Sequence, residues 1–460
     1  MPWDRRTSKQ QQADLARALK AQVVHAVGPF SPYWKARLAA LGTTPSAVAT
    51  PEALAALPPV GERDVCLDGD PAAAAALVLQ AGEAGWAVHA EGPQLRRALA
   101  SRLVRPGAYR ALVEADTRPT TFVEAGLGLR YPLASTRSDL DVVARAGARL
   151  WRVLGLRRAD VLVAGLPLDR TASLQALELA ALAAGSPALF PGDGVDAVAR
   201  ALDLVPATVL ALPVASAARV VDDLDETGAP LGALRVVLLV GAPSDDERAA
   251  AAEALLRAGV NPAVLAVHAP DGHRLLWGEC RPGTGLHSYP DLDLVQLVDP
   301  ETGASASTGE VVVTQLGMRG SALLRWRTGD LAEAVEISRC PGCGRRVPRV
   351  LGVQRAALVP TLQLRQGRRA VDLRGVAAAL EGRADVVDWR LVVGPSARDG
   401  ADELLVHLLP HAAEDASDVA VGVARDVRSA AGLLPTQVVV ADHLPTGSAL
   451  TRRVLVRSVR

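Results

Sequence analysis

Three cysteines and one histidine stand in two short motifs whose chemistry is that of metal binding. Cys280 and His287 lie in GECRPGTGLHSYP, and Cys340 and Cys343 lie in CPGCG. The CPGCG turn directs both thiolates inward, and three thiolates with one imidazole make a closed tetrahedral set for a structural zinc ion. We predict zinc on these four residues. In the alternative interpretation, Cys280 belongs to the core and CPGCG is a redox-active or inert turn.

Two further stretches carry polar chemistry. The segment RWRTGD ends in Asp330, whose carboxylate can accept hydrogen bonds from two neighbouring hydroxyl groups. The segment LVLQAGEAGW places Gly82 and Gly85 after an apolar run, where a phosphate-binding loop can form. Taken alone, RTGD is equally compatible with a strand end that carries a solvated aspartate.

The elements around these motifs alternate between apolar runs and alanine-rich helices from about residue 75 to residue 290. Runs of strand length occur at 160–168, 188–190, 208–214 and 234–243. Helical segments at 174–185 and 244–259 lie between them. Continuous apolar runs of this kind are typical of parallel strands that helices cover on both faces. Residues 1–290 are therefore predicted to form the core of a layered α/β domain.

The pattern changes after residue 290. Antiparallel strands joined by glycine-containing turns are expected over 291–354, as a β-rich subdomain of the same large domain that includes the CPGCG motif. Helical and strand patterns then alternate over 355–460, which predicts a small α+β C-terminal domain.

Composition excludes several classes of protein. The chain has 460 residues, of which 49% are hydrophobic, with 50 basic and 50 acidic residues. These values are typical of a globular protein of more than one domain, and the neutral charge argues against nucleic-acid binding. The polar N-terminus lacks the apolar core of a signal peptide, and no uninterrupted run of about 20 apolar residues predicts a membrane span. We therefore expect a cytoplasmic protein.

The motifs, taken in order, carry a family resemblance. The entry helix FSPYWKARLAALGTTP, the turn LPPVGERDV, the strand LRVVLLVGAP, the pair VDPETG and GEVVVT, and finally RWRTGDLAEAVEISRCPGCGRRVPRVLG follow one another along the chain. This series resembles the phenylacetate–CoA ligase branch of the adenylate-forming (AMP-dependent synthetase) enzymes, over about residues 25–460.

The resemblance implies an enzyme that activates a small carboxylic acid as an acyl-adenylate with ATP and Mg²⁺, and then passes the acyl group to coenzyme A. It implies a small C-terminal domain that rotates over the large one, and members often form homodimers. By resemblance, Asp330 would bind the ribose and Gly241 with Ala242 the adenine. Arg327 belongs to the nucleotide-binding signature, and Asp271 would stand near magnesium.

The phosphate-loop segment departs from the pattern of this family. Gly82 and Gly85 retain the glycines, but the Ser and Thr hydroxyls are missing and Trp86 stands where a lysine is expected. Glu83 adds a carboxylate, and like charges about 4 Å apart repel by roughly 4 kcal/mol at an effective dielectric constant near 20. This loop is therefore predicted to hold a triphosphate poorly.

The catalytic lysine of the family is also missing. Leu450 stands at its position, and the lysines of the chain are confined to Lys9, Lys20 and Lys35. Arg452 and Arg453 are the candidate substitutes, although a guanidinium fork does not replace a compact ammonium. Loss of one preorganised charge donor typically lowers a rate by about 10²–10³-fold.

We therefore predict an adenylate-forming fold whose ATP chemistry is impaired or repurposed. One alternative is a non-catalytic homologue that binds a nucleotide, an acyl group or a protein partner. Another is a transferase that works on a preformed acyl-adenylate or acyl-CoA, which needs no triphosphate loop.

Overall fold

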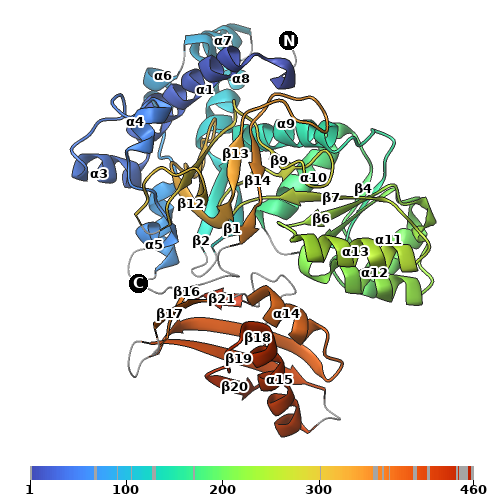
Figure 1. The fold of residues 1–460 in the computed structure, drawn as a ribbon. Coiled ribbons are helices and arrows are strands. Elements are labelled where there is room, and N and C mark those ends of the chain that lie inside the picture. The colour runs from blue at the N-terminus through green and yellow to red at the C-terminus, as the bar shows by residue number, and fades with distance from the viewer. Residues whose placement is uncertain are drawn as a thin grey trace. The chain divides into compact units, whose positions relative to one another are not determined.

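The chain divides into two compact units, Met1–Val353 and Gln354–Arg460. Figure 1 traces both units from the blue N-terminus to the red C-terminus. The structure, a computed structural model, describes all residues except 1–2, 67–69, 91, 105, 127–130, 169–170, 301, 356–360, 365–366, 372, 397–400, 412–414, 442–443, 445–453 and 457–460.

Short helices open the first unit, and polar residues cap them. Thr7 forms a capping box with Gln10, and the Ser31 hydroxyl accepts a hydrogen bond from the Trp34 amide at 3.3 Å. None of the described helices combines the length and the apolar character needed to cross a bilayer. The opening elements are η1 (Trp3–Arg5), α1 (Ser8–Gln22), the π-helical turn η2 (Val23–Val27), α2 (Gly28–Phe30), α3 (Pro32–Ala40), α4 (Pro51–Ala55), α5 (Glu62–Val65) and η4 (Pro71–Leu77).

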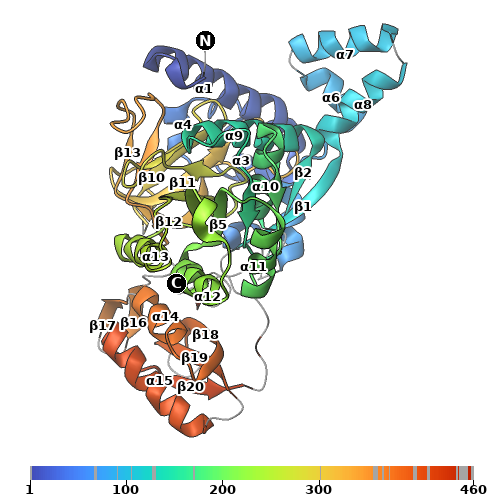
Figure 2. The ribbon, with the colours of Figure 1, turned by 90° about the vertical axis from the view of Figure 1, so that its right-hand side faces the viewer.

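Helices α6 (Glu83–His89), α7 (Gly92–Val104) and α8 (Pro106–Thr117) stand apart from the rest of the first unit in Figure 2. They enclose a small core whose buried members are Trp86, Ala98 and Val113. The loop and the strand–helix alternation predicted from residue 75 are wrong for this stretch. Its Ala, Leu and Arg residues favour helix, and Gly85 lies inside α6.

A β-hairpin leads into the main layers. Strands β1 (Pro119–Ala125) and β2 (Tyr131–Thr136) pair antiparallel. Helix α9 (Arg137–Val153) follows directly, because Thr136 and Asp139 form its capping box.

The centre of the first unit is a nine-stranded sheet in the order β13-β14-β9-β8-β7-β6-β5-β3-β4. The stretch from β7 to β4 is parallel, as the apolar runs predict, and the stretch from β13 to β7 is antiparallel. The strands are β3 (Leu162–Ala164), β4 (Ala188–Leu189), β5 (Val209–Pro213), β6 (Val236–Val240), β7 (Ala263–His268), β8 (Trp277–Gly278), β9 (Leu286–His287), β13 (Ala334–Glu336) and β14 (Arg349–Leu351).

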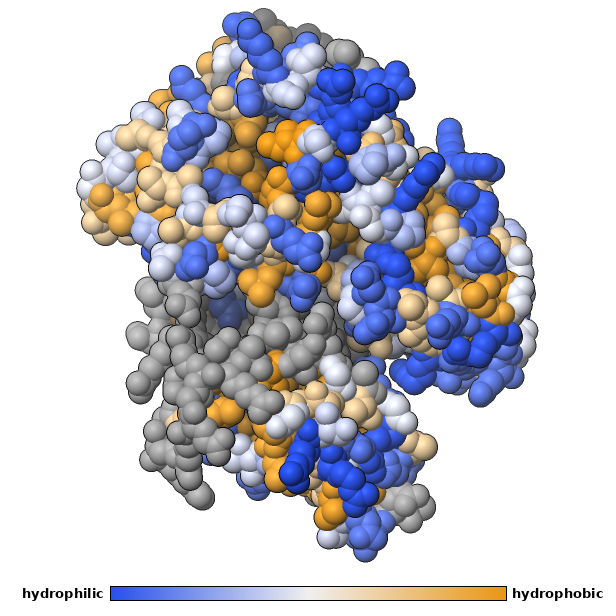
Figure 3. All heavy atoms as spheres, viewed as in Figure 1, coloured by the Kyte–Doolittle hydropathy of each residue, from blue (hydrophilic) through white to orange (hydrophobic). Residues whose placement is uncertain are grey.

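Helices cover both faces of the parallel strands. Leu162 and Ala164 join the core that includes α9 and α10 (Ala172–Ala184), whereas Val163 faces the opposite core. That second core includes α11 (Val195–Leu204), α12 (Ala217–Glu226) and α13 (Asp245–Arg257). Charged and polar side chains gather over α12 and α13 in Figure 3, as expected for helices with one buried face.

Three strands of a separate antiparallel sheet carry the RWRTGD motif. The strands β10 (Asp293–Val298), β11 (Gly309–Gln315) and β12 (Trp326–Ala332) are neighbours in that order. They confirm the antiparallel pattern that the sequence predicts after residue 290.

The second unit is a small α+β module with its own core. Its four-stranded sheet has the order β20-β19-β18-β21, and a separate hairpin pairs β16 with β17. The elements are β15 (Gln354–Arg355), β16 (Thr361–Leu364), β17 (Gly367–Ala370), α14 (Leu373–Glu381), β18 (Val386–Pro395), β19 (Asp402–Pro410), α15 (Ala416–Ala431), β20 (Gln437–Val440) and β21 (Val454–Val456).

A buried carboxylate joins several of these elements in the first unit. Asp139 of α9 is fully buried and accepts hydrogen bonds from the backbone amides of Thr136, Arg319 and Gly320 at 3.0, 2.5 and 2.7 Å. The Arg274 guanidinium, also buried, lies 3.5 Å from the same carboxylate. Burial raises the pKa of Asp139, while Arg274 and the three amides oppose that shift. The carboxylate therefore holds a helix, a strand end and a distant turn together.

Replacing Asp139 with Asn is expected to lower the free energy of unfolding of the first unit by about 3–5 kcal/mol, because it leaves the Arg274 charge buried without its carboxylate. Urea unfolding followed by circular dichroism measures this change. The control is Asp141→Asn on the exposed side of the same helix, expected to stay within about 0.5 kcal/mol of wild type. Equal effects of both substitutions would contradict the assigned role.

Candidate functional site

The carboxyl ends of the parallel strands, the usual binding edge of an α/β sheet, carry several of the predicted residues. Strand β6 ends just before Gly241, and β7 ends at His268, three residues before Asp271. Asp330 on β12 meets this edge through its contact with His268. We call Gly241, His268, Asp271 and Asp330 the strand-end site.

A hydrogen bond between two buried side chains lies at the centre of the strand-end site. The Nε2 atom of His268 is 2.8 Å from Oδ2 of Asp330, and the two side chains are 3% and 0% exposed. The carboxylate that the resemblance assigns to a ribose therefore already has a protein partner. A diol that binds this oxygen has to share it with the imidazole or replace it.

The turn after β6 packs closely against its neighbours. The Gly241 amide donates a hydrogen bond to the Val267 carbonyl at 2.8 Å. Gly241 has a φ of +140°, and a Cβ atom at this position would lie 2.9 Å from the Val214 side chain. Glycine is required here by backbone conformation and by Val214, and Ala242 follows it half-buried.

Asp271 contacts a glycine turn that the sequence interpretation missed. Its Oδ1 atom accepts a hydrogen bond at 2.9 Å from the amide of Gly126, which directly follows β1 and has a φ of +111°. Burial raises the pKa of Tyr131 well above its usual value, and the nearby Asp271 carboxylate adds to the shift. The signal was present in the sequence, because residues 126–130 read GLGLR, a glycine-containing segment typical of a hairpin connection.

Trp326 of the RWRTGD motif packs beside this turn. A Cβ atom on Gly272, whose φ is +71°, would lie 2.5 Å from the Trp326 indole nitrogen. The rings of Trp326 and Tyr131 are 5.5 Å apart between centroids. These contacts join β12 to the loop after β7 and to the hairpin.

Arg327 forms an ion pair within its own sheet. Its Nη1 atom lies 2.7 Å from the Glu310 carboxylate and 3.1 Å from the Pro300 carbonyl oxygen. Burial raises the pKa of Glu310, and the Arg327 charge opposes that shift. The guanidinium is therefore engaged by protein groups, like the carboxylate of Asp330.

The remaining predicted residues have other positions. Gly82 begins α6 as its N-cap, and Gly85 packs within that helix against Phe30, 3.0 Å from where a Cβ would stand. Trp86 is buried and donates its indole N–H to Asp116 at 2.9 Å. The side chain of Glu83 lies outside the described residues, as do Leu450, Arg452 and Arg453.

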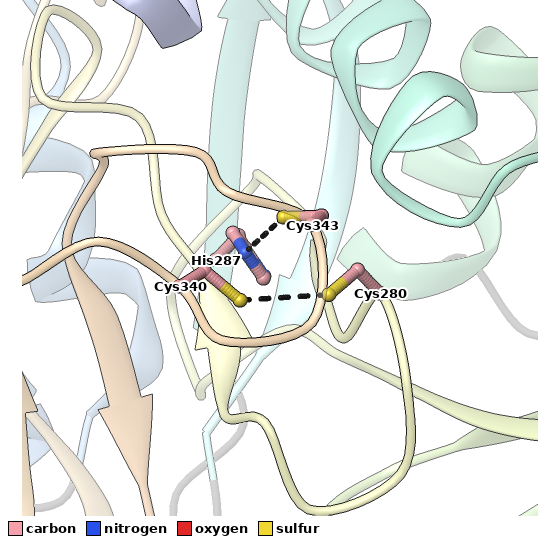
Figure 4. Close-up of side chains that lie close together, drawn as sticks. All are labelled: Cys280, His287, Cys340 and Cys343. Atoms are coloured by element: carbon pink, nitrogen blue, oxygen red, sulfur yellow. Dashed lines mark hydrogen bonds between the residues drawn. The ribbon is translucent and has the colours of Figure 1, made fainter.

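The cysteine and histidine residues of the two sequence motifs come together, although up to 63 positions separate them (Figure 4). The ligand atoms of Cys280, His287, Cys340 and Cys343 all lie within 4.8 Å of one another. The sulfur atoms of Cys280 and Cys340 are 3.6 Å apart, and the Cys343 sulfur is 3.3 Å from His287 Nε2. These four residues form the Cys₃His cluster.

The surroundings of the Cys₃His cluster orient its members. His287 Nδ1 lies 3.2 Å from the Gly278 carbonyl, so a proton on that nitrogen leaves Nε2 as the electron-pair donor. A Cβ atom on Gly342 would lie 2.8 Å from the Cys280 sulfur, so glycine lets the turn close over the cluster.

The pKa shifts of His287 and Cys340 favour metal binding, and that of Cys280 opposes it. Burial lowers the pKa of His287 to about 4, which keeps the imidazole neutral at neutral pH. Burial raises the pKa of the Cys280 thiol to about 12. Burial also acts to raise the pKa of Cys340, but the backbone amides of Cys343 and Gly342 outweigh it and the net shift is downward.

Comparison with known proteins establishes the fold. No family model and no curated protein sequence matches the chain. Two structures of 2-hydroxyisobutyryl-CoA ligase in the postadenylation state, one with R3-HIB-AMP and one with 2-HIB-AMP, are similar to it with TM-scores of 0.64 and 0.65. Each is 16% identical, and the match covers 100% of this chain and 91% of the ligase. An open form of that ligase with 2-HIB-AMP and CoA gives a TM-score of 0.58 at 16% identity, over 99% of this chain and 93% of the ligase.

The chain therefore has the fold of the adenylate-forming ligases, with a large layered α/β domain and a small α+β C-terminal domain. The fold prediction is confirmed. At this level of identity, the likeness establishes the fold alone.

Gly272→Ala is expected to destabilise the protein more than Gly259→Ala, by about 1–3 kcal/mol in the free energy of unfolding. Both glycines have nearly the same φ, +71° and +74°, but only Gly272 has Trp326 in the path of a Cβ atom. The comparison by urea unfolding thus separates the packing cost from backbone strain. Equal losses in the two variants would show that Trp326 moves aside without cost.

Proposed function

We propose that this protein is a carboxylate–CoA ligase homologue of the phenylacetate–CoA ligase type, which binds an acyl-adenylate or a small carboxylic acid at the strand-end site. We further propose that its synthesis of acyl-adenylate from ATP is impaired or repurposed. The solved ligase of the same fold holds HIB-AMP in several states and CoA in two of them, which supports this class of ligand.

The observation that carries the proposal is the protein partner on each polar side chain assigned to the nucleotide. Asp330 is bonded to His268, and Arg327 to Glu310. Asp271 accepts from the amide of Gly126. Any adenosine nucleotide, ATP or acyl-adenylate, has to displace or share these contacts, and each charge-assisted hydrogen bond that is lost costs about 1.5–3 kcal/mol. The features that disfavour ATP in particular are the altered phosphate-loop segment and the missing lysine.

The distribution of lysine supports the same proposal. The last lysine in the chain is Lys35, which is exposed on α3. An ammonium that bridges carboxylate and α-phosphate is therefore not available from the C-terminal domain. Arg452 and Arg453 stay the predicted substitutes, and arginine has a different shape and hydration.

The nucleotide, when bound, supplies the phosphoanhydride that activates a carboxylate. Asp330 would hold the ribose hydroxyls, and Gly241 with Ala242 would lie against the adenine. Asp271 would take part in holding magnesium. The residues present fit a nucleoside monophosphate better than a triphosphate, because the glycines assigned to the phosphate loop lie in and at the start of helix α6.

The predicted order of affinities is an acyl-adenylate mimic first, then AMP, with ATP–Mg²⁺ weaker than the mimic by at least about tenfold. Isothermal titration with a non-hydrolysable phenylacetyl-adenylate, AMP and ATP–Mg²⁺ measures this order. Asp330→Asn is expected to weaken the mimic by about 1.5–3 kcal/mol, because it removes the charge that a ribose diol binds. The exposed Asp141→Asn variant serves as the control.

Two outcomes would contradict the proposal. Binding of ATP–Mg²⁺ as tight as that of the mimic would show that the triphosphate site is intact. Binding of none of the three ligands would favour the non-catalytic alternative, in which the fold serves a protein partner.

We also propose that the Cys₃His cluster holds a structural zinc ion. Tetrahedral ligation with Zn–S bonds near 2.3 Å places two sulfurs ~3.8 Å apart. The 3.6 Å between Cys280 and Cys340 is close to this value. Four protein ligands leave no open coordination position, so zinc at this site would stabilise the junction of β9, β14 and the CPGCG turn rather than take part in catalysis.

Protein purified without added metal is expected to contain about one equivalent of zinc by elemental analysis. Cys340→Ser should lose the metal and lower the melting temperature, because a bound structural ion contributes its binding energy to folding. Cys66→Ala is the matched control, since Cys66 is buried outside the cluster and should leave zinc content unchanged. Metal-free wild-type protein that keeps its stability in a chelator would argue against the zinc site.

A further inference from the structure

Two of the three thiols in the Cys₃His cluster are in contact with each other. The sulfur atoms of Cys280 and Cys340 lie 3.6 Å apart (Figure 4). A disulfide bond holds two sulfurs about 2 Å apart, so these two need to approach by roughly 1.5 Å to form one. The third thiol, of Cys343, has other partners, because its sulfur is 3.3 Å from His287 Nε2 and interacts with the Arg345 guanidinium.

Backbone hydrogen bonds position both cysteines of this pair. The Cys340 amide donates to the Arg345 carbonyl oxygen at 2.8 Å, and the Gly344 amide donates to the Cys340 carbonyl oxygen at 2.9 Å. Cys280 stands two residues after β8, a strand of the nine-stranded sheet. The approach of the two sulfurs, which are 60 positions apart in the chain, is therefore fixed by a tight turn on one side and by the sheet on the other.

The two thiols differ in exposure, which sets the order in which they can react. Cys280 is partly exposed and is followed by the exposed residues 281–283, whereas Cys340 is 2% exposed. A small oxidant therefore reaches the sulfur of Cys280 from solvent, while Cys340 is the buried neighbour that can resolve the oxidised form. Cys66 is buried outside the cluster and has no part in this pair.

We propose that Cys280 and Cys340 form a site of reversible oxidation, at which a peroxide joins the two sulfurs in a disulfide bond and the cluster loses its metal. The inference rests on the proposed zinc site in one respect, because ligation to zinc keeps Cys280 as the reactive thiolate. Once the two sulfurs are joined, Cys343 and His287 are the remaining members of the cluster. Two ligands are too few for a structural zinc ion, which takes four.

The reaction balances with hydrogen peroxide as the oxidant. The Cys280 thiolate attacks one peroxide oxygen, the O–O bond breaks, and a sulfenic acid forms while hydroxide leaves and takes a proton to become water. The Cys340 sulfur then attacks the Cys280 sulfur, the S–O bond breaks, and a second hydroxide leaves and becomes water. The two sulfurs together lose two electrons, which the peroxide gains. A thiol reductant reverses the reaction by thiol–disulfide exchange.

Differential labelling of the full chain tests the pairing. The protein is treated with hydrogen peroxide, its remaining thiols are blocked with N-ethylmaleimide in denaturant, and each cysteine is assigned by tandem mass spectrometry. We expect Cys280 and Cys340 to be linked, and Cys343 and Cys66 to carry the label. Zinc, followed with a chromogenic indicator, should be released in step with the loss of about two thiols per chain. Dithiothreitol should restore both thiols.

The Cys343→Ser variant keeps the pair and should still form the link, and Cys66→Ala should behave as wild type. A link between Cys340 and Cys343 within CPGCG would overturn the proposal, as would zinc that stays bound while peroxide consumes no thiol. Elemental analysis before oxidation separates this result from a failure of the zinc proposal. Protein without zinc that still links Cys280 to Cys340 supports the pairing and contradicts the zinc site alone, whereas protein with neither zinc nor link contradicts both.

Discussion

The buried carboxylate of Asp139 holds together several elements of the first unit. It accepts hydrogen bonds from the backbone amides of Arg319 and Gly320, in a turn about 180 positions away, and it lies 3.5 Å from the guanidinium of Arg274. A buried charge of this kind is tolerated only when several donors surround it, so the elements that supply the donors are held in register. The same turn leads into the RWRTGD strand.

The strand-end site shows how a fold can keep its geometry while its polar groups find partners within the protein. The His268 imidazole is hydrogen-bonded to a carboxylate oxygen of Asp330, and the Glu310 carboxylate pairs with the guanidinium of Arg327. Each pair satisfies a charged group without any ligand, which stabilises the unliganded site. Under the proposed function, a nucleotide would have to compete with these contacts within the protein.

Local patterns were sufficient for much of this architecture. Apolar runs located the parallel strands, and the helical pattern at 244–259 located α13. They failed at Gly82 and Gly85, because glycine after an apolar run is compatible with a loop or with a helix start. The hairpin of β1 and β2 was overlooked because neither PTTFVEA nor YPLAST shows a continuous apolar run or a strict apolar–polar alternation.

The sequence by itself determined the α/β layering, the small α+β module, the pairing of CPGCG with Cys280 and His287, and the lack of lysine after residue 35. Each of these follows from local periodicity, ligand type or composition. Only the tertiary structure decided that His268 meets Asp330 and that the Gln22 side chain donates to the Met318 carbonyl. Such contacts join segments up to about 300 residues apart, and no local propensity records which side chains the packing of layers brings within hydrogen-bond distance.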